Sequence, residues 1–284
     1  MKILITACNG QLGTDAVSYF SKKAEVVPYK DVELDITDVA KVRAAVTEAR
    51  PDVVLNCAAI TNVDGCESNR ELAYRVNSFG AETVAKAAAE VGAELVHIST
   101  DYVFAGNGTM PYRETDPTDP QNVYGSSKLE GEQKAAAACP HTAILRTAWL
   151  YGPHGNNFVK TMLKLGQDHN EVSVVTDQVG NPTSTFELVR MIDAVIRSNK
   201  TGVFHTTCEG VCSWNEFAKE IFRLAGMSVT VKDVTSQQYV RKAHRPSYSV
   251  LSKEKLWKEC DYRPAPWQQA LQEYFDYMAG KIDF

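Results

Sequence analysis

Strands and helices alternate from the first residues of this chain, and this alternation limits its fold more than any other feature of the sequence. Residues 2–6 form a short apolar run with β-branched side chains, and a glycine-containing turn leads from them into a helical segment over residues 11 to about 22. Residues 25–29 then have the pattern of a strand, and residues 39–49 that of a helix. Because neighbouring parallel strands need a crossover helix, the alternation predicts a parallel sheet with helices on its faces.

The alternation continues to about residue 150 and becomes less regular beyond it. The further elements that we predict are strands over 52–56, 94–99 and 143–147, helices over 72–91 and 123–138, an irregular loop over 105–120, helices over 158–165, 185–198, 214–225 and 267–278, and short strands near Val172, Val203 and Val229. The expected fold class is α/β. A Rossmann-like, doubly wound parallel sheet would form the dinucleotide-binding domain in residues 1–150, and a smaller mixed α/β lobe in residues 151–284 would mainly bind substrate. Segments of the two parts are expected to interleave.

Composition and charge exclude several classes of protein. The 284 residues carry a formal net charge of -5, which provides no overall positive field for nucleic acid. No stretch approaches the roughly 18 apolar residues of a membrane span, so we expect no membrane partner and a cytoplasmic location. The 7 cysteines contain no C-x-x-C motif and the 6 histidines no H-x-x-x-H spacing, which predicts neither a disulfide framework nor a metal site.

The turn after the first strand has the position of a dinucleotide-binding motif. Gly10 and Gly13 would let the backbone approach a pyrophosphate at the N-terminus of the following helix, where free N–H groups and the helix dipole favour an anion. Gln11 and Leu12 lie between these glycines and are assigned to the same cofactor site. Ala7 stands where such motifs usually have their first glycine, so the tightest part of the turn must accommodate a methyl group. A strand-to-helix turn without a ligand is the alternative for this motif alone.

The residues after the second strand bear on the choice of cofactor. A carboxylate there would bind the ribose hydroxyls of NADH, and a cation would bind the 2′-phosphate of NADPH. Lys30 and Asp31 stand side by side, so the sequence leaves both cofactors open. Asp35 and Ile36 follow in a loop that we expect to border the adenine.

Tyr124 and Lys128 are four residues apart in a predicted helix and therefore share one face. A free tyrosine has a pKa of about 10, and a nearby ammonium lowers it towards neutrality, where the phenol would serve as a general acid. Thr100 ends a predicted parallel strand, at the sheet edge where open α/β folds bind ligands. An exposed tyrosine beside a lysine is the alternative for the pair alone, but the glycine turn and Thr100 together favour catalysis.

These features resemble the extended short-chain dehydrogenase/reductase family, which combines a glycine-rich turn, a Ser or Thr after the fourth strand and a Y-x-x-x-K motif. Within it, the chain is most similar to the dTDP-4-dehydrorhamnose reductase group. The matching segments are Asn56-Cys-Ala-Ala59, Ser99-Thr-Asp-Tyr-Val-Phe104, Asn122-Val-Tyr-Gly125 with Lys128, Arg146-Thr-Ala-Trp149, Asn157-Phe-Val-Lys-Thr-Met-Leu163, Asp177-Gln-Val-Gly-Asn-Pro-Thr183 and Arg245-Pro246. They span nearly the whole chain.

The resemblance implies an NADPH- or NADH-dependent reduction. A hydride would reach C4 of dTDP-4-dehydro-L-rhamnose while Tyr124 protonates the oxygen, which gives dTDP-L-rhamnose. Lys128 would bind the nicotinamide ribose and lower the pKa of Tyr124, and Thr100 would hydrogen-bond the same sugar oxygen. Positioning of the two reactants would be the main task of the protein.

The resemblance also implies roles for residues elsewhere in the chain. Asn56, Ala58 and Ala59 would line the cofactor cleft, and Asn77 would brace the backbone of the active site. The residues assigned to the sugar nucleotide are Asp101, Tyr102, Trp149, Asn157, Gln178 and Arg245. The guanidinium of Arg245 has the fork geometry that suits a diphosphate. The expected partner is thus a small-molecule nucleotide sugar, and the oligomeric state, including a homodimer, is left open.

Two other functions remain open at this point. A sugar-nucleotide epimerase or dehydratase of the same family would use the same tyrosine but regenerate its cofactor in each turnover. Dehydratases commonly have an Asp-Glu pair after the Ser or Thr, whereas Asp101 is followed here by Tyr102. A non-catalytic NAD(P)-binding regulatory subunit is the second alternative, and Ala7 is the one feature that favours it.

Overall fold

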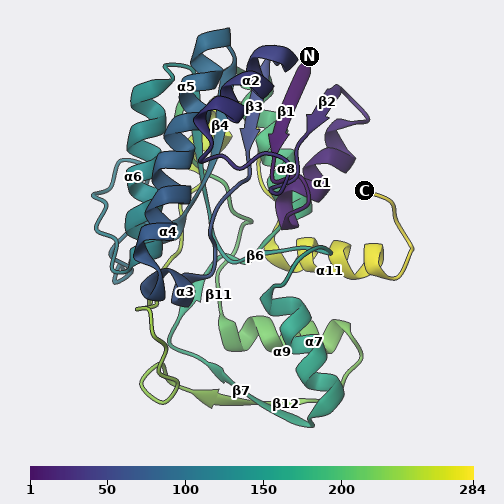
Figure 1. Cartoon of the computed structure of the whole chain (residues 1–284). Helices are drawn as coiled ribbons and strands as arrows, with labels where there is room; N and C mark the ends of the chain where they lie inside the picture. The colour runs from purple at the N-terminus through teal and green to yellow at the C-terminus, as the bar shows by residue number, and fades with distance from the viewer.

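The computed structural model describes residues 1–284, and its centre is a six-stranded parallel sheet with helices on both faces (Figure 1). The strands are β1 (Lys2–Thr6), β2 (Glu25–Pro28), β3 (Val53–Asn56), β4 (Glu94–Thr100), β5 (Thr142–Thr147) and β10 (Gly202–His205). Their order across the sheet is β10-β5-β4-β3-β1-β2, so the chain turns from one side of β1 to the other after β2. Ligands bind in such sheets beyond the carboxyl ends of the strands, at this reversal. The predicted doubly wound α/β fold is confirmed.

Side chains of the sheet alternate between two hydrophobic cores, as the pleat of a strand requires. Ile3 and Ile5 lie in one core, and Leu4 between them lies in the other. The first core is covered by α1 (Gln11–Phe20), α8 (Thr185–Ser198) and α10 (Glu254–Cys260), and the second by α2 (Val39–Ala49), α5 (Ala81–Val91) and α6 (Val123–Ala138). The sheet is therefore buried on both faces, which leaves its carboxyl edge for ligands.

A second lobe lies below the carboxyl edge of the sheet in Figure 1. It contains α7 (Phe158–Asp168), α9 (Trp214–Leu224), α11 (Trp267–Met278) and three two-stranded sheets: β7 (Glu171–Val175) with β12 (Thr230–Val234), β8 (Val179–Gly180) with β11 (Cys212–Ser213), and β6 (Leu150–Tyr151) with β9 (Thr183–Ser184). Its separate core includes Tyr151, Phe217 and Tyr274. The chain leaves this lobe twice to return to the large sheet, once for α8 and β10 and once for α10.

Several elements differ from the sequence prediction. The helix predicted over residues 72–91 consists of α4 (Arg70–Tyr74), a π-helical segment (Arg75–Gly80) and α5, which ends at Gly92 with a φ of 73°. The helix α3 (Val63–Ser68) and the helix α10 were not predicted, because their 6 and 7 residues are too short to show helical periodicity. The strand near Val203 belongs to the large sheet, where it pairs with β5. No helix is both long and apolar enough to cross a membrane.

Candidate active site

The glycine turn after β1 is built on a left-handed residue at Ala7. Ala7 has a φ of 47°, and its carbonyl accepts a hydrogen bond of 2.9 Å from the backbone N–H of Gly10. A Cβ atom at Gly13 would lie 2.3 Å from the same carbonyl oxygen, so only glycine allows α1 to approach the turn this closely. The turn thus holds Ala7 in the left-handed backbone conformation. For an alanine this conformation has an energetic cost of about 1 kcal/mol.

The residues around this turn fit a dinucleotide. Gly10 caps α1 without a side-chain hydrogen bond, and the first turn of α1 has no acidic residue, so its N–H groups are free for an anion. The Asn9 amide donates to the Asp31 carboxylate over 2.8 Å, which ties Asp31 to the turn. The exposed ammonium of Lys30 lies 3.5 Å from Glu33 and has no closer carboxylate. Lys30 is therefore a cation on the surface after β2.

Two residues assigned to the cofactor have buried side chains. The side chain of Ile36 is 3% exposed and packs against Gly80 in the hydrophobic core. Leu12 is likewise a core residue, and only its backbone faces the turn. Asp35 remains on the surface, where its carboxylate accepts a hydrogen bond of 2.9 Å from the Thr37 backbone.

Asn56, the last residue of β3, lies beneath the expected cofactor site. Its side-chain oxygen accepts a hydrogen bond of 2.7 Å from Thr6, and its amide lies 3.2 Å from His97 Nδ1. The Thr6 hydroxyl in turn accepts from the backbone N–H groups of Cys57 and Ala58. Asn56 is 1% exposed, and its bond to Thr6 holds the ends of β1 and β3 together. Ala58 and Ala59 follow at partly exposed positions.

Tyr124 and Lys128 reach the carboxyl end of β4 from the first turns of α6. Asn122 caps this helix by accepting a hydrogen bond of 2.7 Å from the Gly125 N–H. The Lys128 ammonium donates to the Ile98 carbonyl over 2.6 Å, two residues before Thr100. Thr100 ends β4 and accepts a hydrogen bond of 3.2 Å from the Tyr102 N–H. The three residues predicted to be catalytic are thus brought together at one point of the sheet edge.

Two glycines allow α6 to pack closely against its neighbours. A Cβ atom at Gly125 would lie 2.1 Å from the Tyr102 carbonyl oxygen, and one at Gly131 would lie 2.0 Å from the Asn77 carbonyl oxygen. Asn77 lies in the π-helical segment, and its amide donates to the Ile60 carbonyl and to the Ser127 hydroxyl. Asn77 therefore braces α6, as the resemblance implied. Irregular helical turns of this kind are frequent at functional sites.

Burial moves the pKa values of Tyr124 and Lys128 in opposite directions. Desolvation raises the pKa of Tyr124 above its usual value, and the nearby Thr100 hydroxyl opposes this only in part. Desolvation lowers the pKa of Lys128 to about 8, against the opposing effect of Glu132. The expected lowering of the Tyr124 pKa by Lys128 is therefore absent, because desolvation dominates and the ammonium is bonded to a carbonyl. The phenol stays protonated at neutral pH.

Tyr102 and Arg245 connect the active site to the segment between β12 and α10. The Tyr102 ring packs edge-on against Tyr124 at 5.5 Å between centroids. The Arg245 guanidinium lies 3.1 Å from the Tyr102 hydroxyl and 2.9 Å from an Asp64 carboxylate oxygen. Desolvation raises the pKa of Tyr102 to about 12, so its hydroxyl remains neutral. Arg245 is thus held beside the catalytic residues by an acid on α3.

The other residues assigned to the sugar nucleotide have defined partners within the protein. Trp149 has a φ of 48° and stacks on Trp214 at 3.5 Å between ring centroids. Asn157 caps α7 and donates to the Gln11 side chain over 2.9 Å, so it ties the lower lobe to the glycine turn. The Gln178 amide donates to the Ser236 hydroxyl over 2.8 Å. Asn157 therefore has a structural task that the sequence prediction did not include.

The sequence analysis missed two residues of this region, Asp64 and Trp214. Asp64 lies in the short helix α3, which has no periodic pattern, and it meets Arg245 only through the fold. Trp214 is the first residue of α9 and lies within the capping box that Ser213 and Glu216 form. That capping box was a local signal for the helix, but no signal in the sequence indicated its stacking on Trp149.

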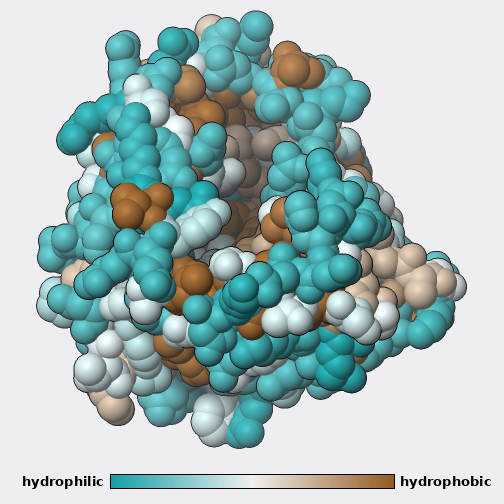
Figure 2. Space-filling view, turned by 90° about the horizontal axis from the view of Figure 1, so that it is seen from below, coloured by the Kyte–Doolittle hydropathy of each residue, from teal (hydrophilic) through white to brown (hydrophobic).

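The face of the molecule seen from below is hollowed at its middle (Figure 2). Hydrophobic atoms lie at the bottom of this hollow, and mostly hydrophilic atoms form its rim. An apolar floor with polar groups around it is typical of sites that bind small molecules. No group of three or more His, Cys, Asp or Glu side chains is arranged to hold a metal ion.

Comparisons with known proteins agree with this geometry. The family model described as "RmlD substrate binding domain" matches residues 1–279. A dTDP-4-dehydrorhamnose reductase of Streptomyces griseus is 43% identical, with 98% of this chain and 94% of the relative covered. The crystal structure of a dTDP-4-dehydrorhamnose reductase from Clostridium acetobutylicum superposes with a TM-score of 0.95 at 48% identity, covering 98% of this chain and 100% of the other. A dTDP-4-dehydrorhamnose reductase from Bacillus anthracis in complex with NADP superposes with a TM-score of 0.95 at 41% identity, covering 97% and 99%. By sequence and by structure, this chain belongs to the RmlD substrate-binding-domain family.

Proposed function

We propose that this protein is an NADPH-dependent reductase that converts the C4 ketone of dTDP-4-dehydro-L-rhamnose into the alcohol of dTDP-L-rhamnose. The observation that carries the proposal is the meeting of Thr100, Tyr124 and Lys128 at the carboxyl end of β4. The glycine turn lies at the same edge of the sheet, after β1. The reductase named for Bacillus anthracis binds NADP, and relatives of this chain are named for the same reaction.

When bound, NADPH supplies the hydride that adds to the carbonyl carbon. The task of the protein is to hold the ketone and to give a proton to its oxygen. Tyr124 holds this proton on its hydroxyl, and its raised pKa keeps the phenol neutral until negative charge develops on the substrate oxygen. Lys128, with a pKa of about 8, keeps its positive charge at pH 7. It would hold the nicotinamide ribose by donating hydrogen bonds to its hydroxyl groups.

Residues 1–150 would bind the cofactor and residues 151–284 mainly the sugar nucleotide. Lys30 would meet the 2′-phosphate, which favours NADPH over NADH. Arg245, which already sits 3.1 Å from Tyr102, would bind the diphosphate. Trp149 would pack against the sugar ring from the start of the lower lobe.

A turnover assay separates the proposal from its alternatives. Purified protein is mixed with dTDP-4-dehydro-L-rhamnose and NADPH, and the absorbance of the reduced nicotinamide is followed. A reductase consumes one NADPH for each sugar reduced. An epimerase or dehydratase would change the sugar without net loss of NADPH, and a regulatory subunit would bind NADPH without any change in the sugar. Either of these results would contradict the proposal.

Tyr124→Phe tests the role of the phenol within that reaction. Because the variant lacks only the phenolic hydroxyl group, we expect kcat to fall by on the order of 100-fold to 10,000-fold. The dissociation constant for NADPH, measured by fluorescence titration, should stay close to that of the unaltered protein. A variant that reduces the sugar at the original rate would show that another group provides the proton.

A further inference from the structure

Asp101 is a buried carboxyl group next to the catalytic threonine, and the reaction as described so far gives it no task. Both Thr100 and Asp101 are 4% exposed. The Thr100 hydroxyl and Asp101 Oδ1 are 2.9 Å apart, and Asp101 Oδ2 has no hydrogen-bond partner. A buried carboxylate normally has partners for both oxygens, so an isolated Oδ2 indicates that the group does not carry its charge here.

The protonation state of Asp101 decides whether the Thr100 hydroxyl can donate a hydrogen bond to the substrate oxygen. A threonine hydroxyl has one hydrogen to donate and two lone pairs to accept with. One lone pair of Thr100 is taken by the Tyr102 N–H at 3.2 Å. If Asp101 is ionised, it can only accept, so it takes the single hydrogen of Thr100 and leaves none for the substrate oxygen. If Asp101 is a neutral acid with its hydrogen on Oδ1, Thr100 accepts from it, and its own hydrogen points to the neighbouring Tyr124 oxygen or to a substrate oxygen bound beside it.

We propose that Asp101 acts as a neutral acid whose hydrogen bond to Thr100 turns the threonine hydroxyl towards the substrate oxygen. Asp101 is thus a positioning residue that acts through Thr100, and this role replaces the sugar contact expected from the sequence. The proposal rests on the reductase function, because it concerns the donor that faces the ketone. In the reaction itself Asp101 keeps its hydrogen, and the proton that the substrate gains comes from Tyr124.

The surroundings of Asp101 favour the neutral form. Burial raises its pKa to about 7, and the side chains of Thr100 and Ser249 and the backbone N–H groups of Asp101 and Tyr102 oppose this only in part. The titratable groups that face it are Tyr102 from its own turn and Tyr124 from α6, both with raised pKa values. The two nearby cations are engaged elsewhere, since Arg245 is paired with Asp64 and Lys128 is bonded to the Ile98 carbonyl. No free positive charge therefore stabilises a carboxylate at this position.

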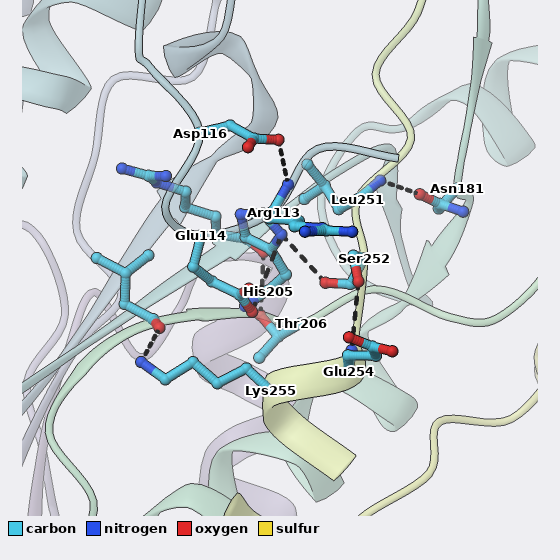
Figure 3. A network of polar contacts seen from close by, with 12 residues as sticks. Arg113, Glu114, Asp116, Asn181, His205, Thr206, Leu251, Ser252, Glu254 and Lys255 are labelled. Atoms are coloured by element: carbon cyan, nitrogen blue, oxygen red, sulfur yellow. Dashed lines mark hydrogen bonds and ion pairs between the residues drawn. The ribbon is translucent and has the colours of Figure 1, made fainter. Parts of the chain in front are cut away.

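The segment that brings Ser249 to Asp101 is fixed by a polar network (Figure 3). The Leu251 N–H donates to Asn181 over 2.9 Å, and the Ser252 carbonyl lies 3.1 Å from His205 Nδ1. Glu114 accepts from the His205 N–H over 3.0 Å on the other side. The enclosure of Asp101 is therefore part of the fold and does not depend on a mobile side chain.

The pH dependence of turnover tests the proposal. An acid with a raised pKa is neutral below that pKa and ionised above it, so kcat should fall as the pH rises through about 7 in an assay from about pH 5.5 to 7.5, a range in which Lys128, with a pKa of about 8, remains mostly charged. In Asp101→Asn the amide can donate to Thr100 at every pH. We expect this variant to keep kcat within a few-fold of the low-pH value and to lose the decline. Asp101→Ala should also be flat, but about tenfold or more slower, because nothing orients Thr100.

Glu94→Gln is the matched control. Glu94 begins the same strand, β4, and burial raises its pKa to about 7 as well, but it lies at the opposite end of the strand from Thr100. Its replacement should leave the decline in kcat unchanged. A decline that persists in Asp101→Asn, or disappears in Glu94→Gln, would overturn the proposal. So would a raised KM with an unaltered pH profile of kcat in Asp101→Asn, because that result indicates a direct sugar contact.

Infrared difference spectra of the full chain read the protonation state without turnover. The difference between the unaltered protein and Asp101→Asn should contain a band of a protonated carboxyl group below about pH 7, which disappears at higher pH. Absence of that band would overturn the neutral-acid proposal even if the protein is an active reductase. A band without any turnover of sugar would instead overturn the reductase function, and with it the task assigned to Asp101.

Discussion

Lys128 is the residue at which function and stability oppose each other most directly. It is 2% exposed, and burial lowers its pKa to about 8. Its ammonium has one hydrogen bond, to the Ile98 carbonyl, and no carboxylate in an ion pair with it. A desolvated charge with so few partners destabilises a folded protein. Its proposed task, to bind the nicotinamide ribose, accounts for an ammonium at this buried position.

Lys128→Met should therefore be more stable and inactive. We expect the free energy of unfolding at pH 7 to rise by on the order of 1 to 3 kcal/mol, because the variant no longer buries an ammonium. The unfolded chain binds more protons than the folded one between about pH 8 and 10, so the stability of the unaltered protein should increase over that range, whereas that of the variant should not. Urea unfolding at several pH values measures both effects. A variant that is less stable at pH 7 would show that the ammonium contributes to the fold.

The sequence predicted the arrangement of Thr100, Tyr124 and Lys128 better than it predicted their electrostatics. Spacing alone placed Tyr124 and Lys128 on one helix face, because four residues are about one helical turn. The pKa of Tyr124 depends on how deeply α6 is packed against the turn after β4, which is not a local property of the sequence. For the same reason, the sequence could assign Asn56, Ile36 and Asn157 to the site, but it could not identify the residues that their side chains contact.

At the scale of elements, the turn between β1 and α1 explains how a chain without the usual first glycine retains a dinucleotide site. Ala7 adopts the left-handed conformation that glycine would adopt more easily. Gly13, in contrast, has no alternative, because its missing Cβ atom leaves the space for the Ala7 carbonyl. The two positions should therefore respond to substitution in opposite ways.

Ala7→Gly and Gly13→Ala make this a paired test. Ala7→Gly removes a left-handed alanine, so we expect the free energy of unfolding to rise by on the order of 0.5 kcal/mol and NADPH to bind as before. Gly13→Ala forces the turn and α1 apart, so NADPH should bind at least about tenfold more weakly. Fluorescence titration and urea unfolding measure the two quantities. Equal NADPH affinities in both variants would contradict the account of this turn.

Elements with strong local patterns were predicted and those defined by distant contacts were not. Residues 39–49 and 123–138 were predicted as the helices that the structure contains. The break of the helix predicted over 72–91 into α4, a π-helical segment and α5 has no signature in apolar spacing, because the extra residue of a π turn barely disturbs the pattern. The place of β10 in the large sheet depends on pairing with β5, some 60 residues away in the chain, and no local pattern specifies it.

At the scale of the whole molecule, the two lobes share their chain and should unfold together. The helix α8 contributes Leu188, Ile192 and Val195 to the core of the large sheet, although it begins directly after β9 of the lower lobe. Asn157 and Gln11 add a hydrogen bond of 2.9 Å between α7 and the glycine turn. Neither core can be exposed without loss of elements that support the other.

Tryptophan fluorescence and far-ultraviolet circular dichroism test this coupling. Three of the 4 tryptophans, Trp149, Trp214 and Trp267, lie in or against the core of the lower lobe. The fourth, Trp257, lies on α10 beside the large sheet, and Trp257→Phe restricts the emission to the lower lobe. In this variant the fluorescence transition in urea should coincide with the circular dichroism transition, which reports helices of both lobes. Two separate midpoints would show that the lobes unfold independently.

The glycine contacts of α6 also determine where new substrate preferences can be evolved. With Gly125 against the Tyr102 carbonyl and Gly131 against the Asn77 carbonyl, the helix that carries the proton donor has no freedom to shift or rotate. Random mutagenesis directed at α6 should mostly return inactive clones. Libraries for unnatural sugar substrates are better placed in the lower lobe, around Trp149 and Gln178. Side chains there can be replaced without a change in the position of the Tyr124 hydroxyl.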